Sequence, residues 1–166
     1  MKVWGPFSAL GLSVGVLAAL ADQLHKRWTI ELLEALPGRK IVVAPFFDLE
    51  LAWNRGISYG LFKQDSDAGR LALAAFAVCA VIALAYWLAH LQTRLAAIGA
   101  GLIIGGAIGN ATDRLHYGAV ADFFAFHVGS FHWYIFNVAD VAIVVGVGAL
   151  LLDSLWFSHK TAGKQV

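Results

Sequence analysis

The sequence predicts an all-α membrane protein with four transmembrane helices, a small extracytoplasmic antiparallel β-sheet and an interfacial helix, in a single domain over residues 1–166. The first observation is composition: 60% of the 166 residues are hydrophobic and 14% are charged, whereas soluble domains are about 25% charged. The second is a set of four long apolar segments. The third is a strand-like alternation in the polar segment after the first of them. The net charge of +1 provides no basic patch, so nucleic acid is not an expected partner.

A spanning helix needs about 20 mainly apolar residues. The segments that meet this length are residues 3–21, 71–89, 95–112 and 138–157. The first also resembles a cleaved signal peptide, because Lys2 precedes it and Ala19 to Ala21 form a possible cleavage site. Its length and the three later spans favour a retained helix. The single cysteine, Cys79, lies within the second span, and we expect its thiol to be buried.

The segment between the first two spans carries signals of both helix and strand. Residues 24–36 predict a short interfacial helix. Residues 47–54 alternate apolar and polar side chains, which is the period of a strand. Residues 54–56 form a turn signal, and the alternation resumes over residues 57–61. We therefore expect a small antiparallel sheet over about residues 40–64, resting on the membrane surface.

Four spans place both ends of the chain on one side of the membrane. On that side, Lys and Arg occur in short segments, whereas on the other side they occur mostly within residues 25–70. Short loops set the orientation, and long segments translocate largely regardless of their charge. Both termini are therefore predicted to be cytoplasmic, with residues 25–70 and 113–137 at the outer face.

Four acidic residues stand where a membrane makes them costly. Asp22, Asp113 and Asp140 each lie at the end of a predicted span, and Asp122 lies between the last two spans. A charged side chain at the centre of a spanning helix costs about 2.5–3.5 kcal/mol, so such residues indicate a functional site. The alternative is that each acid marks a solvated helix end.

Two of these acids follow an asparagine at the same spacing. Asn110 and Asp113 are three residues apart, as are Asn137 and Asp140, so each pair shares a helix face on which the amide can donate to the carboxylate. Asn137 also fits a helix cap, with Asp140 in the first turn. Asp113 instead closes its helix, where the dipole disfavours a carboxylate, and we expect Arg114 to supply the counter-charge.

Two other chemistries are less well supported by the residues. Residues 11–15 read GLSVG and match the Gly-x-Ser-x-Gly motif, but that motif needs a strand-to-helix turn. Here it lies within a predicted span, where its glycines suit close helix packing. The six histidines form no recognised metal motif. A site of carboxylate and histidine ligands stays open as an alternative, but no metal and no cofactor is predicted.

A pair of carboxylates suits peptide-bond cleavage without a cofactor. Two acids held close together share one proton, because both cannot ionise at once. The ionised acid can activate a water while the protonated acid polarises a carbonyl. Arg114 is expected to hold Asp113 ionised, whereas Asp122 has only Ala, Val and Phe beside it. The residues therefore favour Asp122 and Asp140 as the pair.

Five motifs, in their order and spacing, resemble the lipoprotein signal peptidase (signal peptidase II) family. They are DQLHK from Asp22, NRGISYGLF from Asn54, GGAIGNATDR ending at Arg114, GAVADF ending at Phe123 and FNVADVAIVVG from Phe136. The resemblance implies a four-helix aspartic endopeptidase of the bacterial cytoplasmic (inner) membrane with its active site at the outer face. It implies removal of the signal peptide from prolipoproteins, N-terminal to a diacylglyceryl-modified cysteine.

The same resemblance implies roles for individual residues and partners. Asp122 and Asp140 match the catalytic pair. Membrane lipid and globomycin-type inhibitors are implied as partners, and a monomer is expected because one chain holds every required group. The residues that match supporting or substrate-binding positions are Asp22, Lys26, Asn54, Gly56, Asn110, Asp113, Arg114 and Asn137.

The chain departs from the family pattern at Ile57, Tyr59 and Tyr134, which affects the sheet or the loop over the substrate but removes no catalytic group. From the residues alone, two other functions stay open. A small transporter or proton relay would have acids along the depth of the membrane. A structural subunit would use its polar pairs only to hold helices together, and variants of the acids would then fail to fold.

Overall fold

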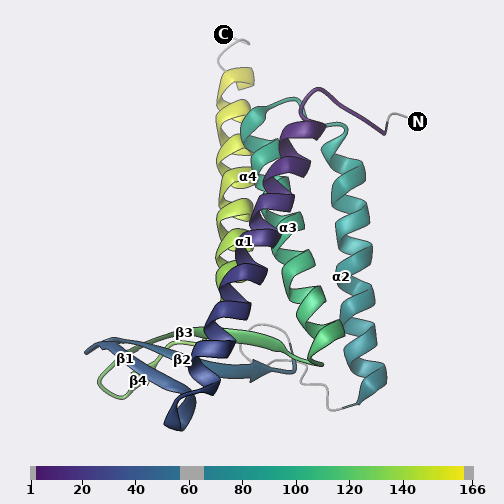
Figure 1. Cartoon of the computed structure of the whole chain (residues 1–166). Helices are drawn as coiled ribbons and strands as arrows, with labels where there is room; N and C mark the ends of the chain where they lie inside the picture. Colours follow the sequence, from purple (N-terminus) through teal and green to yellow (C-terminus); the bar gives the residue numbers. More distant parts are fainter. Residues whose placement is uncertain (1–2, 57–65, 163–166) are drawn as a thin grey trace.

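The computed structural model describes residues 3–56 and 66–162, which form four long helices beside a four-stranded sheet (Figure 1). The described part of each helix is long and apolar enough to cross a membrane, so the chain is a multi-pass membrane protein. The elements in chain order are α1 (Ser8–Glu34), η1 (Pro37–Arg39), β1 (Lys40–Ala44), β2 (Phe47–Asn54), α2 (Asp67–Leu88), α3 (Arg94–His116), β3 (Val120–Val128), β4 (Phe131–His132) and α4 (Val138–Ala162).

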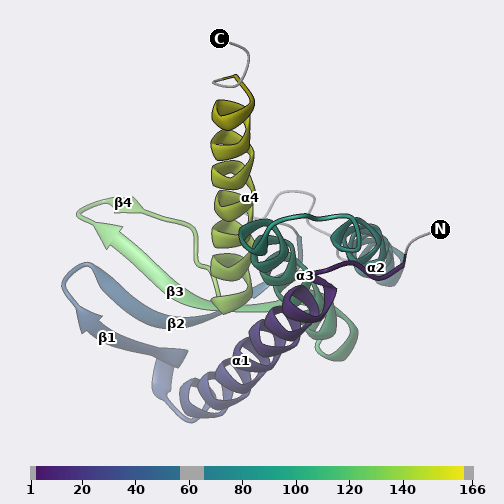
Figure 2. The same ribbon diagram turned by 90° about the horizontal axis from the view of Figure 1, so that it is seen from above.

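Helix α3 is the centre of the bundle and contacts each of the other three helices (Figure 2). Glycines allow α1 and α3 to approach closely. A Cβ at Gly101 would overlap the carbonyl oxygen of Gly11, and one at Gly105 would overlap that of Gly15. The glycines of the GLSVG segment therefore serve close helix packing, as expected for small residues in membrane helices.

The boundaries of the first helix differ from the predicted ones. Helix α1 begins at Ser8 rather than at residue 3, and it runs without a break to Glu34. The interfacial helix predicted over residues 24–36 is thus the last part of α1, because no proline or glycine interrupts the chain between Val16 and Glu34. At 1.5 Å per residue, its 27 residues extend about 40 Å, which exceeds the roughly 30 Å hydrocarbon core of a membrane.

The other helices lie where apolar length predicted them, with modest extensions. Helix α3 continues past residue 112 to His116, so Asp113 and Arg114 belong to its last turns. Cys79 of α2 is exposed rather than buried, which corrects the expectation for its thiol. The reason is that α2 packs mainly against α3 and turns its remaining sides outward.

The sheet is antiparallel with the strand order β1-β2-β3-β4. Strands β1 and β2 fall within the predicted sheet region of residues 40–64, and the alternation over residues 47–54 correctly indicated β2. The alternation over residues 57–61 lies outside the described residues. The sequence did not predict β3, because its first four residues are buried and give no alternation of apolar and polar side chains. It did not predict β4 either, because a strand of two residues is too short to show a period.

The sheet packs against the C-terminal end of α1. Ile30 and Leu33 of α1 pack against Leu51 of β2 and against Ala121 and Phe123 of β3. The start of α1 and the end of α4 lie at the opposite end of the bundle from the sheet (Figure 1). This packing holds β2 and β3 against the ends of the helices, which is where the polar residues singled out above gather.

Candidate active site

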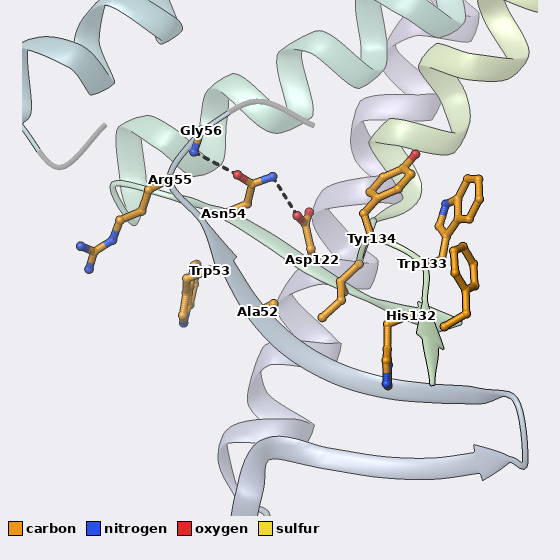
Figure 3. A pocket seen from close by; sticks show the side chains of 11 residues that line it. Ala52, Trp53, Asn54, Arg55, Gly56, Asp122, His132, Trp133 and Tyr134 are labelled. Atoms are coloured by element: carbon orange, nitrogen blue, oxygen red, sulfur yellow. Dashed lines mark hydrogen bonds between the residues drawn. The ribbon is translucent and has the colours of Figure 1, made fainter. Parts of the chain in front are cut away.

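The register of the sheet brings Asn54 beside Asp122. Asp122 lies opposite Ala52 in the β2–β3 ladder, and Asn54 lies two residues further along β2, on the same face. The Nδ2 atom of Asn54 donates to Asp122 Oδ2 at 3.1 Å. The backbone N–H of Gly56 donates to Asn54 Oδ1 at 2.9 Å, which turns the nitrogen of that amide toward Asp122 (Figure 3).

Strand β3 also fixes the start of α4. The N–H groups of Phe123 and Phe124 donate to the carbonyl oxygen of Phe136 at 3.0 and 2.9 Å. The next residue, Asn137, caps α4: its Oδ1 accepts from the N–H of Asp140 at 2.9 Å, and Asp140 Oδ2 accepts from the N–H of Asn137 at 3.3 Å. The capping role expected for Asn137 is therefore present, and it places Asp140 near β3.

Two asparagine amides connect Asp122 to Asp140. Asn137 Nδ2 donates to Asp122 Oδ1 at 2.6 Å and to Asn110 Oδ1 at 3.1 Å. Asn110 Nδ2 in turn donates to Asp140 Oδ1 at 2.9 Å. Together with the bonds described above, each of the four carboxylate oxygens accepts an N–H. The two acids are thus oriented as one unit.

The environment of Asp122 favours its protonated form. The residue is 3% exposed. Burial and, to a smaller extent, the negative charge of Asp140 raise the pKa of its carboxyl group to about 7, against the opposing effect of the hydrogen bonds from Asn54 and Asn137. One acid that holds its proton near neutral pH beside a second, half-buried acid is the arrangement that general acid and general base chemistry requires.

A second buried cluster lies behind this pair. Lys26 Nζ contacts Asp22 Oδ2 at 2.9 Å, Asp113 Oδ2 at 2.8 Å and Asn110 Oδ1 at 2.9 Å. The side chain of Lys26 is 2% exposed, and those of the two acids are fully buried. Asp22 Oδ1 also accepts from the N–H of Ala139 at 2.9 Å, and Asp113 Oδ2 from the N–H of Ala121 at 3.1 Å. The two acids thereby tie α1 to α4 and α3 to β3.

Arg114 does not serve the role predicted for it. Its Nη1 donates to the carbonyl oxygen of Asn110 at 3.2 Å, and its Nη2 donates to that of Gly56 at 2.8 Å. The counter-charge of Asp113 is instead Lys26. Consecutive helical residues point in different directions, so a neighbour in sequence is not a neighbour in space. Arg114 links the segment after β2 to α3 beside the two acids.

Sequence reasoning missed one member of the buried cluster. Gln23 Nε2 contacts Asp113 Oδ1 at 2.9 Å, the carbonyl oxygen of Gly109 at 3.2 Å and Asp22 Oδ2 at 3.3 Å. Gln23 lies within the DQLHK motif, but nothing in the sequence indicates a partner 90 residues away. Its contacts are with Asp22 and Asp113 of the second buried cluster and not with Asp122 or Asp140.

Two cavities adjoin the acids. A cavity of about 520 Å³ is lined by Asp122, residues 52–56 of β2 and the segment that follows, and residues 131–135 (Figure 3). A second cavity, of about 210 Å³, lies among α2, α3 and α4 and is lined in part by Asp140. Asn54, Tyr134 and Ile135 contribute to both. Asp122 and Asp140 therefore face adjoining spaces, one between β2 and residues 131–135 and one between the helices.

Histidine and carboxylate side chains do not gather into a metal site within residues 3–56 and 66–162, where no group of three or more His, Cys, Asp or Glu could hold an ion. His127 instead contacts Asp48 Oδ2 at 2.9 Å and stacks on His132. His127 therefore has a hydrogen-bonded structural role at the edge of the sheet.

The sequence matches known proteins over most of its length. The family model described as Signal peptidase (SPase) II matches residues 14–156. A lipoprotein signal peptidase of Rhodopseudomonas palustris is 53% identical over 150 residues, covering 88% of this chain and 92% of its own. That of Nitrobacter hamburgensis is 55% identical over 148 residues, covering 87% and 90%.

Solved structures support the same fold. A bacterial membrane enzyme determined by the in meso method at 2.3 Å resolution superposes with a TM-score of 0.76 at 23% identity, over 90% of each chain. A second, determined at 1.9 Å resolution, has a TM-score of 0.73 at 23% identity and covers 93% of this chain and 97% of its own. With the family model matching most of its length and relatives at about half identity, this chain belongs to the signal peptidase II family.

Proposed function

We propose that this chain removes the signal peptide from prolipoproteins by cleaving N-terminal to a diacylglyceryl-modified cysteine, with Asp122 and Asp140 as the catalytic pair. One observation carries the proposal. Two carboxylates, one of which has a pKa of about 7, are joined through two asparagine amides where two cavities meet. The names of the relatives support the substrate class.

The chemistry follows from the different environments of the two acids. Ionised Asp140 takes a proton from a water as the water oxygen attacks the scissile carbonyl carbon, while protonated Asp122 donates its proton to the carbonyl oxygen. When the tetrahedral intermediate collapses, Asp140 passes a proton to the leaving amine, and Asp122 recovers one from the hydroxyl group. The C–N bond breaks, and both acids return to their starting states.

The structure also supports a location for the site in the membrane. The sheet and both acids lie at one end of the bundle, and the start of α1 and the end of α4 lie at the other (Figure 1). We place the sheet end at the outer face of the bacterial inner membrane, with both termini in the cytoplasm. The acyl chains and the signal helix of a substrate then enter laterally, from the lipid, toward the cavity among α2, α3 and α4.

The arrangement of the acids does not favour a transporter or proton relay. Asp22, Asp113, Asp122 and Asp140 form one connected cluster near the sheet, linked through Lys26, Asn110 and Asn137. A relay would need acids spread along the depth of the bundle. One chain contributes every group of the cluster, which supports action as a monomer.

The test is cleavage of a lipidated precursor by the purified protein. We expect the wild type to produce a mobility shift that globomycin blocks, and Asp140→Asn to produce none while still inserting into membranes. Asp153→Asn is the matched control, because Asp153 lies near the other end of α4 and accepts a hydrogen bond from Thr93. Normal processing by Asp140→Asn, or no processing by the wild type, contradicts the proposal.

A further inference from the structure

We propose that buried Lys26 is a positioning residue that determines which end of the Asn110 side chain faces Asp140. The inference rests on the proposed pairing of Asp122 with Asp140, and it concerns how that pair is kept in its working arrangement.

The two ends of an asparagine amide have nearly the same shape but opposite hydrogen-bonding character. Asn110 Oδ1 accepts from Lys26 Nζ at 2.9 Å and from Asn137 Nδ2 at 3.1 Å, and Asn110 Nδ2 donates to Asp140 Oδ1 at 2.9 Å. An ammonium group has three donors and no acceptor, so it can face only the oxygen. A flipped amide would place N–H groups against Lys26 and an oxygen against the Asp140 carboxylate, and both contacts would be repulsive.

Lys26 is itself held in place. Its three protons match three acceptors, on Asp22, Asp113 and Asn110. Asp22 is bound to the backbone of Ala139, the residue before Asp140. Asp113 is bound to the backbone of Ala121, the residue before Asp122. The ammonium is therefore placed relative to the same two segments that carry the catalytic acids.

The other two asparagines of the site do not need a lysine. Asn54 Oδ1 accepts from the backbone N–H of Gly56, and Asn137 Oδ1 accepts from the backbone N–H of Asp140. In both cases the backbone fixes which end of the amide carries the donors. The bonds to Asn110 Oδ1 come from side chains, and that of Lys26 is the charged one. Removing this charge leaves only the uncharged Asn137 amide among these two donors to hold Asn110 Oδ1, and it alters neither cavity, because Lys26 lines neither.

The experiment compares Lys26→Met with Gln23→Met. For each variant we measure kcat and KM with a lipidated precursor as substrate, and the thermal unfolding midpoint of the variant itself. Gln23 shares Asp22 and Asp113 with Lys26 but does not contact Asn110, so it is a matched control for loosening the cluster. Loss of one preorganised donor typically costs about 100-fold or more in kcat. We expect that loss for Lys26→Met with KM within about twofold of the wild-type value, whereas Gln23→Met keeps its kcat even where its midpoint falls.

A double-variant cycle identifies the route of the effect. If Lys26 acts through Asn110, adding Lys26→Met to Asn110→Leu lowers kcat no further. The proposal is overturned if the two substitutions lower kcat independently, so that their fold-losses multiply in the double variant. It is also overturned if the kcat of Lys26→Met is no lower than that of Gln23→Met. If Lys26→Met fails to fold, the same comparison is made in proteins that also carry Asp113→Asn. This second substitution removes one buried negative charge and so compensates for the positive charge lost with Lys26. Cleavage by Asp140→Asn would instead refute the catalytic pair itself.

Discussion

Replacement of Asp122 by asparagine separates a catalytic role from a structural one. The substitution keeps the shape of the side chain but removes its ability to carry a proton or a charge. We expect cleavage of the lipidated precursor to fall to background, because the group that protonates the scissile carbonyl is lost. We also expect the variant to fold and to become more stable than the wild type as the pH rises.

The magnitude follows from the pKa of Asp122, which burial and the charge of Asp140 together raise from 3.8 to about 7. Between these values the folded protein keeps a proton that the unfolded chain releases, so the wild type loses about 1.4 kcal/mol of stability per pH unit. The loss is absent below about pH 4 and complete above about pH 7. Between pH 5 and pH 8, Asp122→Asn therefore gains about 3 kcal/mol of stability relative to the wild type.

A second effect of the same substitution does not depend on pH. Asp122 accepts N–H groups from Asn54 and Asn137 on separate oxygens, and an asparagine offers one oxygen. The donor left without an acceptor costs about 1–3 kcal/mol. At pH 5 the two effects nearly cancel, and at pH 8 the variant is the more stable protein by about 1–3 kcal/mol.

The assay is thermal unfolding in detergent at pH 5 and pH 8, together with cleavage at each pH. A stability difference that does not change with pH would refute the raised pKa of Asp122. Retained cleavage would refute its catalytic role. A variant that fails to insert or fold would support the alternative in which the acids only hold the helices together.

Two further predictions concern the sheet and the helix bundle. The hydrogen bond from Lys40 holds the pKa of Asp48 below its ordinary value, so we expect Asp48→Asn to be less stable than the wild type at pH 7. The difference in stability should shrink as the pH falls through the folded-state pKa of Asp48. A difference that stays constant with pH would contradict this ion pair. A side chain at Gly101 would overlap the carbonyl oxygen of Gly11, so we expect Gly101→Val to lower the thermal midpoint by the equivalent of about 1–3 kcal/mol or more. The control is Gly148→Ala, whose new side chain meets no atom within 4 Å and is expected to keep or raise the midpoint. Equal midpoints for the two variants would contradict the close packing of α1 and α3.

The helices could be located from composition because a membrane imposes its own rule. Backbone groups within the hydrocarbon must bond inside their own segment, so about 20 apolar residues predict a spanning helix. The alternation over residues 47–54 likewise predicted β2, since Leu49, Leu51 and Trp53 share the face of that strand that packs into the cluster with α1 and β3. Strand β3 escaped prediction because its first half is buried on both faces, which removes the alternation on which such a prediction depends.

The residues of the candidate site were also predicted only in part. The sequence was enough to single out Asp22, Asp113, Asp122 and Asp140, because a charge is costly in an apolar chain wherever the fold places it. The capping of α4 by Asn137 was also visible, because a cap involves residues three apart. These properties depend on composition and on local spacing, which a linear sequence displays directly.

The partners of those acids required the folded chain. Asn54 and Asp122 are 68 residues apart, and Lys26 and Asn110 are 84 apart. Local reasoning paired Asp113 with Arg114, its neighbour in sequence, whereas packing of α1 against α3 paired it with Lys26. Hydrogen bonds and ion pairs act over about 3 Å. Which groups come that close depends on how helices and strands pack, and no spacing along a single helix or strand contains that information.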